Sequence, residues 1–297
     1  MLDPLFVQKL TKVSKIEKDV DLSKKTTFQI GGVTPFFVSP ACRAELVAVL
    51  DLCRQYKVNY RILGAGSNVL VRDNVDFIVI STLKLKKTAI KSSGLVYAEA
   101  GAKLGEIIRL TADRGLSGIE NLVGIPASIG GAVVMNAGAF GTQIADCVLF
   151  VDVYYKGRIK RISLKNLFFE YRHSVFTKSK KYVIIGVALL LKKDSKVDIV
   201  ERIRTTVFAR SKSQKIGYPN AGSIFKKTSP LAPAYMIQQC GLKGFLIGSA
   251  QVSNIHSGFI INLGNSTCQD VIKVIHYVRR KVKQTFGVWL QLEIILL

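Results

Sequence analysis

Short apolar runs alternate with amphipathic segments over the first two thirds of the chain. The apolar runs have the length and composition of strands; they are FFV at 36, FIVI at 77, LVYAEA at 95, CVLFVDVYY at 147 and YVIIGVALLL at 182. Between them, CRAELVAVLDLCRQY and KLGEIIRLTADRG have helical spacing. In the first of these segments, Leu46, Val47, Leu50 and Cys53 fall on one side, and we expect this stripe to pack on a sheet. The pattern from 27 to 191 therefore predicts an α+β domain.

A polar stretch at 192–196 separates this region from a second one. Beyond it the pattern predicts a helix at VDIVERIRTTVFARSKSQ, a loop at YPNAGSIF, a helix at APAYMIQQCG, a strand at SGFIIN, a basic helix at CQDVIKVIHYVRRKVKQTFG and a last strand at VWLQLEIILL. We place a domain boundary at the polar stretch. The sequence thus predicts two domains, residues 1–195 and a smaller α+β domain at 196–297.

The composition is that of a folded protein. The chain has 297 residues, of which 48% are hydrophobic and 21% charged, and this is enough for two domains with their own cores. Charged residues interrupt the apolar runs of the N-terminus, and the longest apolar run is too short to cross a bilayer. The five cysteines are widely spaced, without a CxxC pair or zinc spacing. We therefore expect a cytoplasmic protein with reduced thiols, no metal and no membrane partner.

The net charge of +23 raises the question of a nucleic-acid partner. The basic runs are far apart, at KLKK from 84, KSKK from 178 and RRKVK from 279, and none alternates with aromatic residues as in a single-strand binder. This distribution favours solubility or weak nonspecific attraction over specific nucleic-acid binding. A basic surface also suits a small substrate that carries several phosphates.

Two glycine-rich segments are candidates for a binding site. They are GAGSN at 64–68 and GLSGIENLVGIPASIGGAVVMNAGAFG at 115–141. Glycine lets main-chain N–H groups approach an anion closely, so two such loops could grip an elongated phosphate ligand. The alternative is structural, with a tight connection between strands in the first segment and a crowded crossover in the second. GxxxxGK[ST] is absent and GAGSNV does not fit GxGxxG, which excludes a P-loop nucleotidase and a Rossmann dehydrogenase.

Six motifs follow one another in an order typical of one bacterial family. They are GAGSN at 64, GIPASIGGAVVMNAGAFG at 124, EYRHSVF at 170, NAGSIFKK at 220, CGLKG at 240 and VWLQLE at 288. Over nearly its whole length the chain resembles the UDP-N-acetylenolpyruvoylglucosamine reductases, flavoenzymes that complete muramic acid for peptidoglycan synthesis. The resemblance implies an FAD-binding domain of the vanillyl-alcohol-oxidase type at 1–195, followed by a substrate-binding domain at 196–297.

By this resemblance, the two glycine loops bind FAD through backbone N–H groups and small polar side chains. The implied residues are Gly64, Ala65, Gly66, Ser67, Asn68, Val69, Gly124, Ile125, Pro126, Ser128, Gly130, Gly131, Asn136, Ala137 and Gly138. Some relatives in the superfamily attach flavin covalently to histidine. Here His173, His256 and His276 lie outside both loops, so we expect noncovalent FAD.

The resemblance also implies the reaction, which is reduction of UDP-N-acetylglucosamine enolpyruvate by NADPH through FAD. Arg172 matches the arginine that stabilises the enolate, Ser223 the proton donor, and Glu293 the partner of Arg172 at the enolate. A guanidinium suits a carboxylate because it stays charged and donates two parallel hydrogen bonds. From the residues alone, a surface arginine, a turn serine and an exposed glutamate remain alternatives.

For the UDP pyrophosphate, the candidates are Arg210, Lys215, Lys226 and His256; a structural role for His256 is the alternative. The chain departs from the family in Ala127 of GIPAS, in Gln214-Lys215, and in Lys226-Lys227-Thr228. The interval from Arg172 to Ser223 is too short for an inserted tyrosine loop, so we expect the branch without that loop. We also expect a monomer. Another FAD oxidoreductase on the same module and a nucleic-acid-binding protein are the competing hypotheses.

Overall fold

The structure is a computed structural model that describes residues 2–179, 181–214 and 216–297. It divides into two compact units, and neither is continuous in sequence. Unit 1 consists of Met1–Lys18, Pro35–Ala65 and Phe77–Ala209, and unit 2 of Asp19–Thr34, Gly66–Asp76 and Arg210–Leu297. The two predicted domains were continuous in sequence. Unit 2 instead includes two early segments, Asp19–Thr34 and Gly66–Asp76, and unit 1 includes residues 196–209 of the helix that follows residue 195. The assignment of FAD and substrate to those domains stays a prediction.

The larger sheet of unit 1 is antiparallel, in the order β12-β11-β13-β7-β6. Its strands are β6 (Thr88–Ile90), β7 (Leu95–Glu99), β11 (Val148–Tyr155), β12 (Arg158–Ser163) and β13 (Val183–Leu190). Strand β13 is buried on both faces: Ile184 and Val187 belong to one core, Val183 and Ile185 to another. Burial on two faces explains why YVIIGVALLL reads as an unbroken apolar run.

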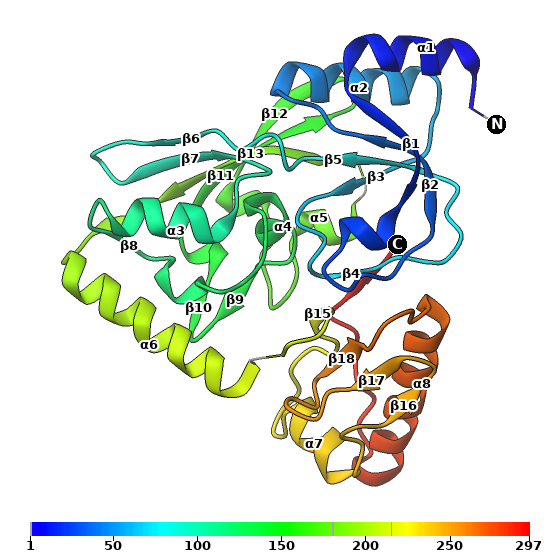
Figure 1. Cartoon of the computed structure of the whole chain (residues 1–297). Helices are drawn as coiled ribbons and strands as arrows, with labels where there is room; N and C mark the ends of the chain where they lie inside the picture. Colours follow the sequence, from blue (N-terminus) through cyan, green and yellow to red (C-terminus); the bar gives the residue numbers. More distant parts are fainter. Residues whose placement is uncertain (1, 180, 215) are drawn as a thin grey trace. The chain divides into compact units, whose positions relative to one another are not determined.

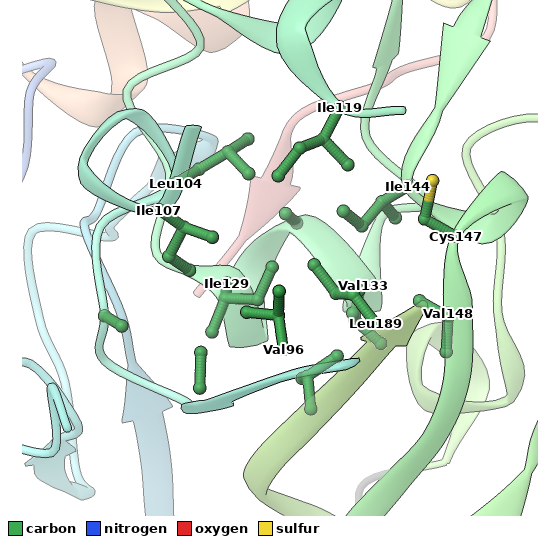
Figure 2. Close-up of a cluster of buried hydrophobic side chains, with 14 of the residues drawn as sticks. Val96, Leu104, Ile107, Ile119, Ile129, Val133, Ile144, Cys147, Val148 and Leu189 are labelled. Carbon is green, nitrogen blue, oxygen red and sulfur yellow. The ribbon is translucent and has the colours of Figure 1, made fainter. Parts of the chain in front are cut away.

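Helices α3 (Leu104–Ala112) and α4 (Ile129–Val134) contribute to the first of these cores. Figure 2 shows Ile129 and Val133 of α4 among side chains of the sheet, including Val96 and Leu189. Helix α4 is part of the second glycine-rich segment, 115–141, and its packing holds this segment against the sheet. Helix α6 (Lys196–Gln214), drawn in yellow-green in Figure 1, adds Ile203 to the same core.

A four-stranded sheet, in the order β1-β2-β5-β3, supports the first glycine loop. Its strands are β1 (Ile16–Asp21), β2 (Val33–Val38), β3 (Tyr60–Leu63) and β5 (Ile78–Ser81), and β2 and β3 run parallel to β5. Helices α1 (Pro4–Val13) and α2 (Arg43–Gln55) pack in the associated core. The buried side of α2 includes Leu46, Leu50 and Cys53, as predicted, but Val49 is buried while Val47 is only partly so.

Unit 2 contains the antiparallel sheet β15-β18-β17-β16. The strands are β15 (Asn220–Ser223), β16 (Leu246–Ile247), β17 (Ala250–Val252) and β18 (Phe259–Asn262); α7 (Pro233–Gln239) and α8 (Cys268–Phe286) pack with them in one core (Figure 1). Helix α8 begins in a capping box between Thr267 and Asp270, and ends at Gly287 with φ 72°. That left-handed conformation favours glycine, which explains why the basic helix stops there.

The remaining elements are short. They are η1 (Leu22–Lys25), η2 (Glu120–Leu122), η3 (Ile144–Asp146), η4 (Leu164–Asn166) and α5 (Val175–Lys178), with the strand pairs β8 (Leu116–Ser117) and β14 (Lys192–Lys193), β9 (Gly138–Ala139) and β10 (Thr142–Gln143), and β4 (Val69–Leu70) and β19 (Ile295–Leu296). The predicted last strand is therefore shorter than expected, because before Ile295 only Leu292 forms a bridge. Within the described residues, no helix is long and apolar enough to cross a membrane.

Candidate active site

The first glycine loop joins β3 to β4 and is crowded. A Cβ atom built on Gly64 would lie 2.3 Å from Ser128 Oγ, and one on Gly66 would lie 2.6 Å from the Lys25 carbonyl oxygen. Gly66 also has φ 66°, which side chains disfavour. The backbone N–H groups of residues 64–68 donate no hydrogen bond to any other described residue. Consecutive N–H groups of this kind form an anion-binding concavity, so the loop is both a tight connection and a candidate phosphate site.

The second glycine segment meets the first at Ser128, but its own N–H groups are engaged. At the start of α4, Ile129 donates to the Ala102 carbonyl (2.8 Å) and Gly130 to the Ala100 carbonyl (2.9 Å). Gly131 donates to Ser128 Oγ at 3.3 Å. The amides of Ile129 and Gly130 therefore attach the start of α4 to the segment of Ala100 and Ala102, and the amide of Gly131 is capped by Ser128.

The segment continues into a tight hairpin of β9 and β10. Ala139 pairs with Thr142, and the two residues between them, Phe140 and Gly141, both have positive φ (49° and 79°), as in a type I′ turn. Asn136, before the hairpin, has φ 43° and is 1% exposed. The hairpin is thus fixed by its own pairing and by the residues that precede it.

Arg172 lies in a four-residue turn of unit 1. Glu170 and His173 exchange two backbone hydrogen bonds, each 3.1 Å, and Arg172 between them has φ 52°. A non-glycine residue in this region costs about 1–2 kcal/mol, so surrounding contacts must hold it. One such contact is the bond from Arg172 Nη2 to the Gly138 carbonyl, at 2.9 Å. The half-buried guanidinium is therefore oriented by the hairpin.

Ser223 and Glu293 are neighbours in unit 2. Phe225 and Leu292 form an antiparallel bridge, and Glu293 donates its backbone N–H to the Ile224 carbonyl at 2.8 Å. Both Ser223 and Glu293 are half-buried. Within the described part of the chain, the Ser223 hydroxyl makes no hydrogen bond, whereas Asn220 Oδ1 accepts the Gly222 N–H at 3.0 Å. The turn is therefore capped by Asn220, and the alternative role of Ser223 as a capping residue does not apply.

Asn68 links the first glycine loop to the strand that carries Glu293. Its side-chain amide donates to the Glu293 carbonyl at 3.2 Å, and its own carbonyl accepts from Ile295 at 3.0 Å. Strands β4 and β19 then run parallel, with Val69 opposite Ile295. The end of the predicted FAD loop and Glu293 thus belong to one piece of unit 2.

The candidates for the UDP pyrophosphate differ in their surroundings. Arg210 donates to Gln214 Oε1 at 3.2 Å, Lys226 is half-buried, and Lys215 lies outside the described residues. His256 accepts the Gly258 N–H on Nδ1 at 3.1 Å and packs its ring against Phe259. Burial lowers the pKa of His256, and nearby Lys243 adds to this, so the ring is neutral at neutral pH. These contacts agree with a structural role for His256.

Comparison with known proteins places the chain in a family. The profile of the C-terminal domain of UDP-N-acetylenolpyruvoylglucosamine reductase matches residues 214–297, and that of an FAD-binding domain matches residues 34–163. The UDP-N-acetylenolpyruvoylglucosamine reductase of Pseudothermotoga lettingae is 38% identical over 281 residues, which cover 94% of this chain and 97% of the relative. This chain belongs to the UDP-N-acetylenolpyruvoylglucosamine reductase family. A Clostridium perfringens relative of the same name is also 38% identical, with 94% and 92% of the two chains covered.

Solved structures agree with this membership. The reductase of this family from Thermus caldophilus matches with a TM-score of 0.81 and 32% identity, over 95% of this chain and 99% of that chain. Alkyldihydroxyacetonephosphate synthase matches with a TM-score of 0.52 and 14% identity, over 65% and 41% of the two chains, which shows a shared fold only. The predicted family, the α+β fold and the FAD-binding module are confirmed. The chain is an FAD-dependent oxidoreductase, and its place in the loopless branch stays a prediction.

Three residues outside the predicted set also shape the site: Ser174, Gln143 and Thr27. Ser174 donates to the Val134 carbonyl at 2.6 Å, and Thr27 donates its N–H to the Gly66 carbonyl at 3.1 Å. A signal for Ser174 was available, because Ser174 and Thr177 have the spacing of a capping box. Nothing in the local sequence around Thr27 indicates its contact with the loop.

Proposed function

We propose that this chain reduces UDP-N-acetylglucosamine enolpyruvate to UDP-N-acetylmuramate in peptidoglycan precursor synthesis, with NADPH as reductant, in the cytoplasm where both substrates are available. The proposal rests on one observation above all. In a chain of this family, the bridge between Phe225 and Leu292 places Glu293 opposite Ile224, the residue that follows Ser223, so a hydroxyl and a carboxyl lie on two segments that are bonded to each other. These are the two groups that protonation of an enolate next to a carboxylate requires.

The residues present fit FAD. The unengaged N–H groups of residues 64–68 suit its pyrophosphate, and the close approach of Gly64 to Ser128 leaves no room for a side chain at that point. When bound, FAD supplies hydride transfer, from NADPH and then to the terminal methylene of the enolpyruvyl group. The role of this chain is to bind and orient the substrate, and to manage the charge and the proton that follow.

Arg172 stabilises the charge that accumulates on the substrate carboxylate. As hydride adds to the methylene carbon, the electrons of the double bond move toward the carboxylate and an enolate forms. A guanidinium has five N–H donors in a fixed plane, and the bond to the Gly138 carbonyl uses one of them. Arg172 thus meets the developing charge with an orientation that is set before the reaction.

Ser223 donates the proton that completes the reaction. The proton passes from the Ser223 hydroxyl to the carbon next to the carboxylate. Lys226 follows Ser223 closely in the sequence and is half-buried, and its positive charge stabilises the negative charge left on the serine oxygen. Glu293 supports this step in its protonated form. An ionised Glu293 would repel the substrate carboxylate and so raise the energy of the enolate. Arg210 and Lys215 contribute to binding the UDP moiety, while His256 keeps its structural role.

An anaerobic visible spectrum tests this proposal. The flavin band is recorded before NADPH, after one equivalent of NADPH, and again after UDP-N-acetylglucosamine enolpyruvate is added. We expect the band to bleach with NADPH and to return with the sugar. A band that bleaches and stays bleached would contradict the proposed substrate, and rapid return in air alone would support an FAD oxidase instead.

A further inference from the structure

Asn136 sits where two parts of unit 1 meet. It is almost completely buried, 1% exposed, and every group of its side chain is used within the protein. Its amide nitrogen donates to Gln143 Oε1 at 2.8 Å and to the Glu170 carbonyl at 3.0 Å. Its Oδ1 accepts the Ala145 N–H at 3.2 Å. Both N–H groups of the amide are therefore engaged, and none remains to donate to FAD.

The two acceptors of Asn136 belong to the two structures that fix Arg172. Glu170 is the first residue of the turn in which Arg172 has φ 52°. Gln143 is the β10 residue that pairs with Gly138, and Gly138 supplies the carbonyl that holds the guanidinium. One side chain thus connects the backbone of the turn to the strand pair that orients its arginine.

The other end of the turn is fixed in the same way by the same segment. Ser174, which is 0% exposed and directly follows the turn, donates to the Val134 carbonyl at 2.6 Å. Val134 and Asn136 are two residues apart at the end of α4, which is docked on the sheet. Both ends of the Glu170–His173 turn are therefore attached to one rigid element, as a strained backbone requires.

We propose that Asn136 is a positioning residue for Arg172 and not an FAD ligand. This inference rests on the proposed function, because it assigns the reduction of the enolpyruvyl group as the step that depends on Arg172. Loss of the amide frees the Glu170 end of the turn, while Ser174 still holds the other end, and the guanidinium loses its fixed orientation. A displacement of about 1 Å in such a group lowers a rate by about a hundredfold.

Stopped-flow measurement of the two half-reactions tests the proposal on the FAD-loaded enzyme. We compare Asn136→Ala and the nearly isosteric Asn136→Asp with the wild type. We expect return of the flavin band with the enolpyruvyl sugar to slow by about ten- to a hundredfold. Bleaching by NADPH should stay within about twofold, and the dissociation constant of FAD, measured by flavin fluorescence, within about threefold. Equal slowing of both half-reactions, or weaker FAD binding as the main effect, would overturn the proposal.

Asn121→Ala is the matched control. Asn121 donates to Thr142 Oγ1 at 3.1 Å, so it supports the same hairpin, and within the described part of the chain it makes no hydrogen bond to the turn. We expect near wild-type half-reactions for it. If Asn136→Ala does not fold, Gln143→Ala is the second variant. Gln143 is exposed, and its loss removes one of the two groups that accept from the Asn136 amide, so reoxidation by the sugar should slow less than in Asn136→Ala. Unchanged reoxidation in Gln143→Ala and in Asn136→Asp would also count against the proposal.

A double-substitution cycle and hydrogen exchange separate this proposal from the proposed function. In an Arg172→Ala background, adding Asn136→Ala should slow reoxidation by the sugar by less than about twofold more, because Asn136 acts through the arginine. Full additivity would contradict that. If the wild type itself is not reoxidised by the sugar, the proposed function fails. The positioning of the turn is then judged by exchange of the Glu170 and His173 amides in the protein without FAD, which should quicken in Asn136→Ala and not in Asn121→Ala.

Discussion

The Arg172 turn and the bridged segments 223–226 and 291–293, called the strand pair below, hold their side chains by different means. In the strand pair, backbone groups form the bonds between the two segments: Glu293 donates its N–H to the Ile224 carbonyl and Lys226 its N–H to the Gln291 carbonyl. Asn68 adds one side-chain bond, to the Glu293 carbonyl. In the turn, the backbone is strained at Arg172, and the attachments to α4 come from the side chains of Asn136 and Ser174. The first arrangement depends on the local fold and the second on particular residues.

This difference predicts where substitutions have consequences. Near the strand pair, apart from Asn68, whose side-chain amide donates to the Glu293 carbonyl, only the reacting side chains should matter, because the other bonds join backbone groups. Near the turn, residues that never contact the substrate should also matter. The following substitutions test this contrast, beginning with the largest expected effect.

Ser223→Ala removes the proton donor without a change in the strand pair. We expect reoxidation of the reduced enzyme by the enolpyruvyl sugar to slow by about 10²–10⁴-fold, the usual contribution of a positioned acid. Bleaching by NADPH should be unaffected, and so should the melting temperature. Ser229→Ala, at an exposed position further along the same loop, is the control. A Ser223→Ala enzyme that is reoxidised at the wild-type rate would remove Ser223 from the mechanism.

Arg172→Lys keeps the positive charge but loses the planar fork. An ammonium group cannot bond to the Gly138 carbonyl and also donate two parallel bonds to a carboxylate, so we expect reoxidation to slow by about 100-fold. Single-turnover kinetics at saturating sugar measure this. The control is Arg161→Lys, because Arg161 makes a comparable two-bond contact with Asp152 in the same unit. Equal rates for Arg172→Lys and the control would show that charge alone suffices.

The two sides of this contrast were not equally predictable from the sequence. The strand pair was predictable in outline, since alternation in VWLQLEIILL predicts extended backbone, although β19 covers only Ile295–Leu296. Helices α2, α3, α6, α7 and α8 were predictable because their burial follows the helical period. The Arg172 turn was not, because its attachments join residues 34 and 40 positions apart in the chain. Contacts of that kind leave no periodic signal in the sequence.

The sequence also did not indicate which segments of the chain make up unit 2. Residues 19–34 and 66–76 join it because Phe28, Ile30 and Leu70 are buried in the same core as α7 and α8. A reading of the chain from one end to the other assigns these residues to the domain around them. The error at Val47 is different in kind: Leu46, Val49, Leu50 and Cys53 follow the i, i+3, i+4, i+7 spacing of one helix face, so strict use of the helical period selects Val49 rather than Val47.

Ser174→Ala tests the stability side of the contrast. Ser174, which is 0% exposed, donates to the Val134 carbonyl at 2.6 Å and accepts the Phe176 N–H at 3.2 Å. We expect the free energy of unfolding to fall by about 2 kcal/mol, because two buried groups lose their partner. Gln291→Ala, on the strand pair, removes an exposed side chain and should stay within about 0.5 kcal/mol. Urea denaturation followed by far-ultraviolet circular dichroism measures both; equal losses would contradict the contrast.

Glu120→Gln extends the contrast to a second side-chain network of unit 1, beside the second glycine segment. Glu120 accepts from the Gly118 N–H at 2.6 Å, and from Ser117 Oγ and Arg202 Nε at 2.8 Å each. Burial acts to raise the pKa of Glu120, but these hydrogen bonds outweigh it and the pKa is lowered from 4.5. The network therefore stabilises the fold above the unfolded-state pKa, and this stabilisation is lost as the pH falls through the folded-state value.

At neutral pH we expect Glu120→Gln to lower the free energy of unfolding by about 1.5 kcal/mol, the lower end of the range for a hydrogen bond to a charged group. The difference from the wild type should stay constant down to a pH of about 4.5 and shrink below it, since the wild-type carboxylate then becomes protonated. Urea denaturation at each pH measures this. Glu201→Gln is the control, because Glu201 is exposed on α6 and its ion pair with Arg204 is 4.0 Å long. A difference that does not change with pH would mean that the charge of Glu120 contributes nothing, and that side-chain shape alone holds the start of the glycine segment.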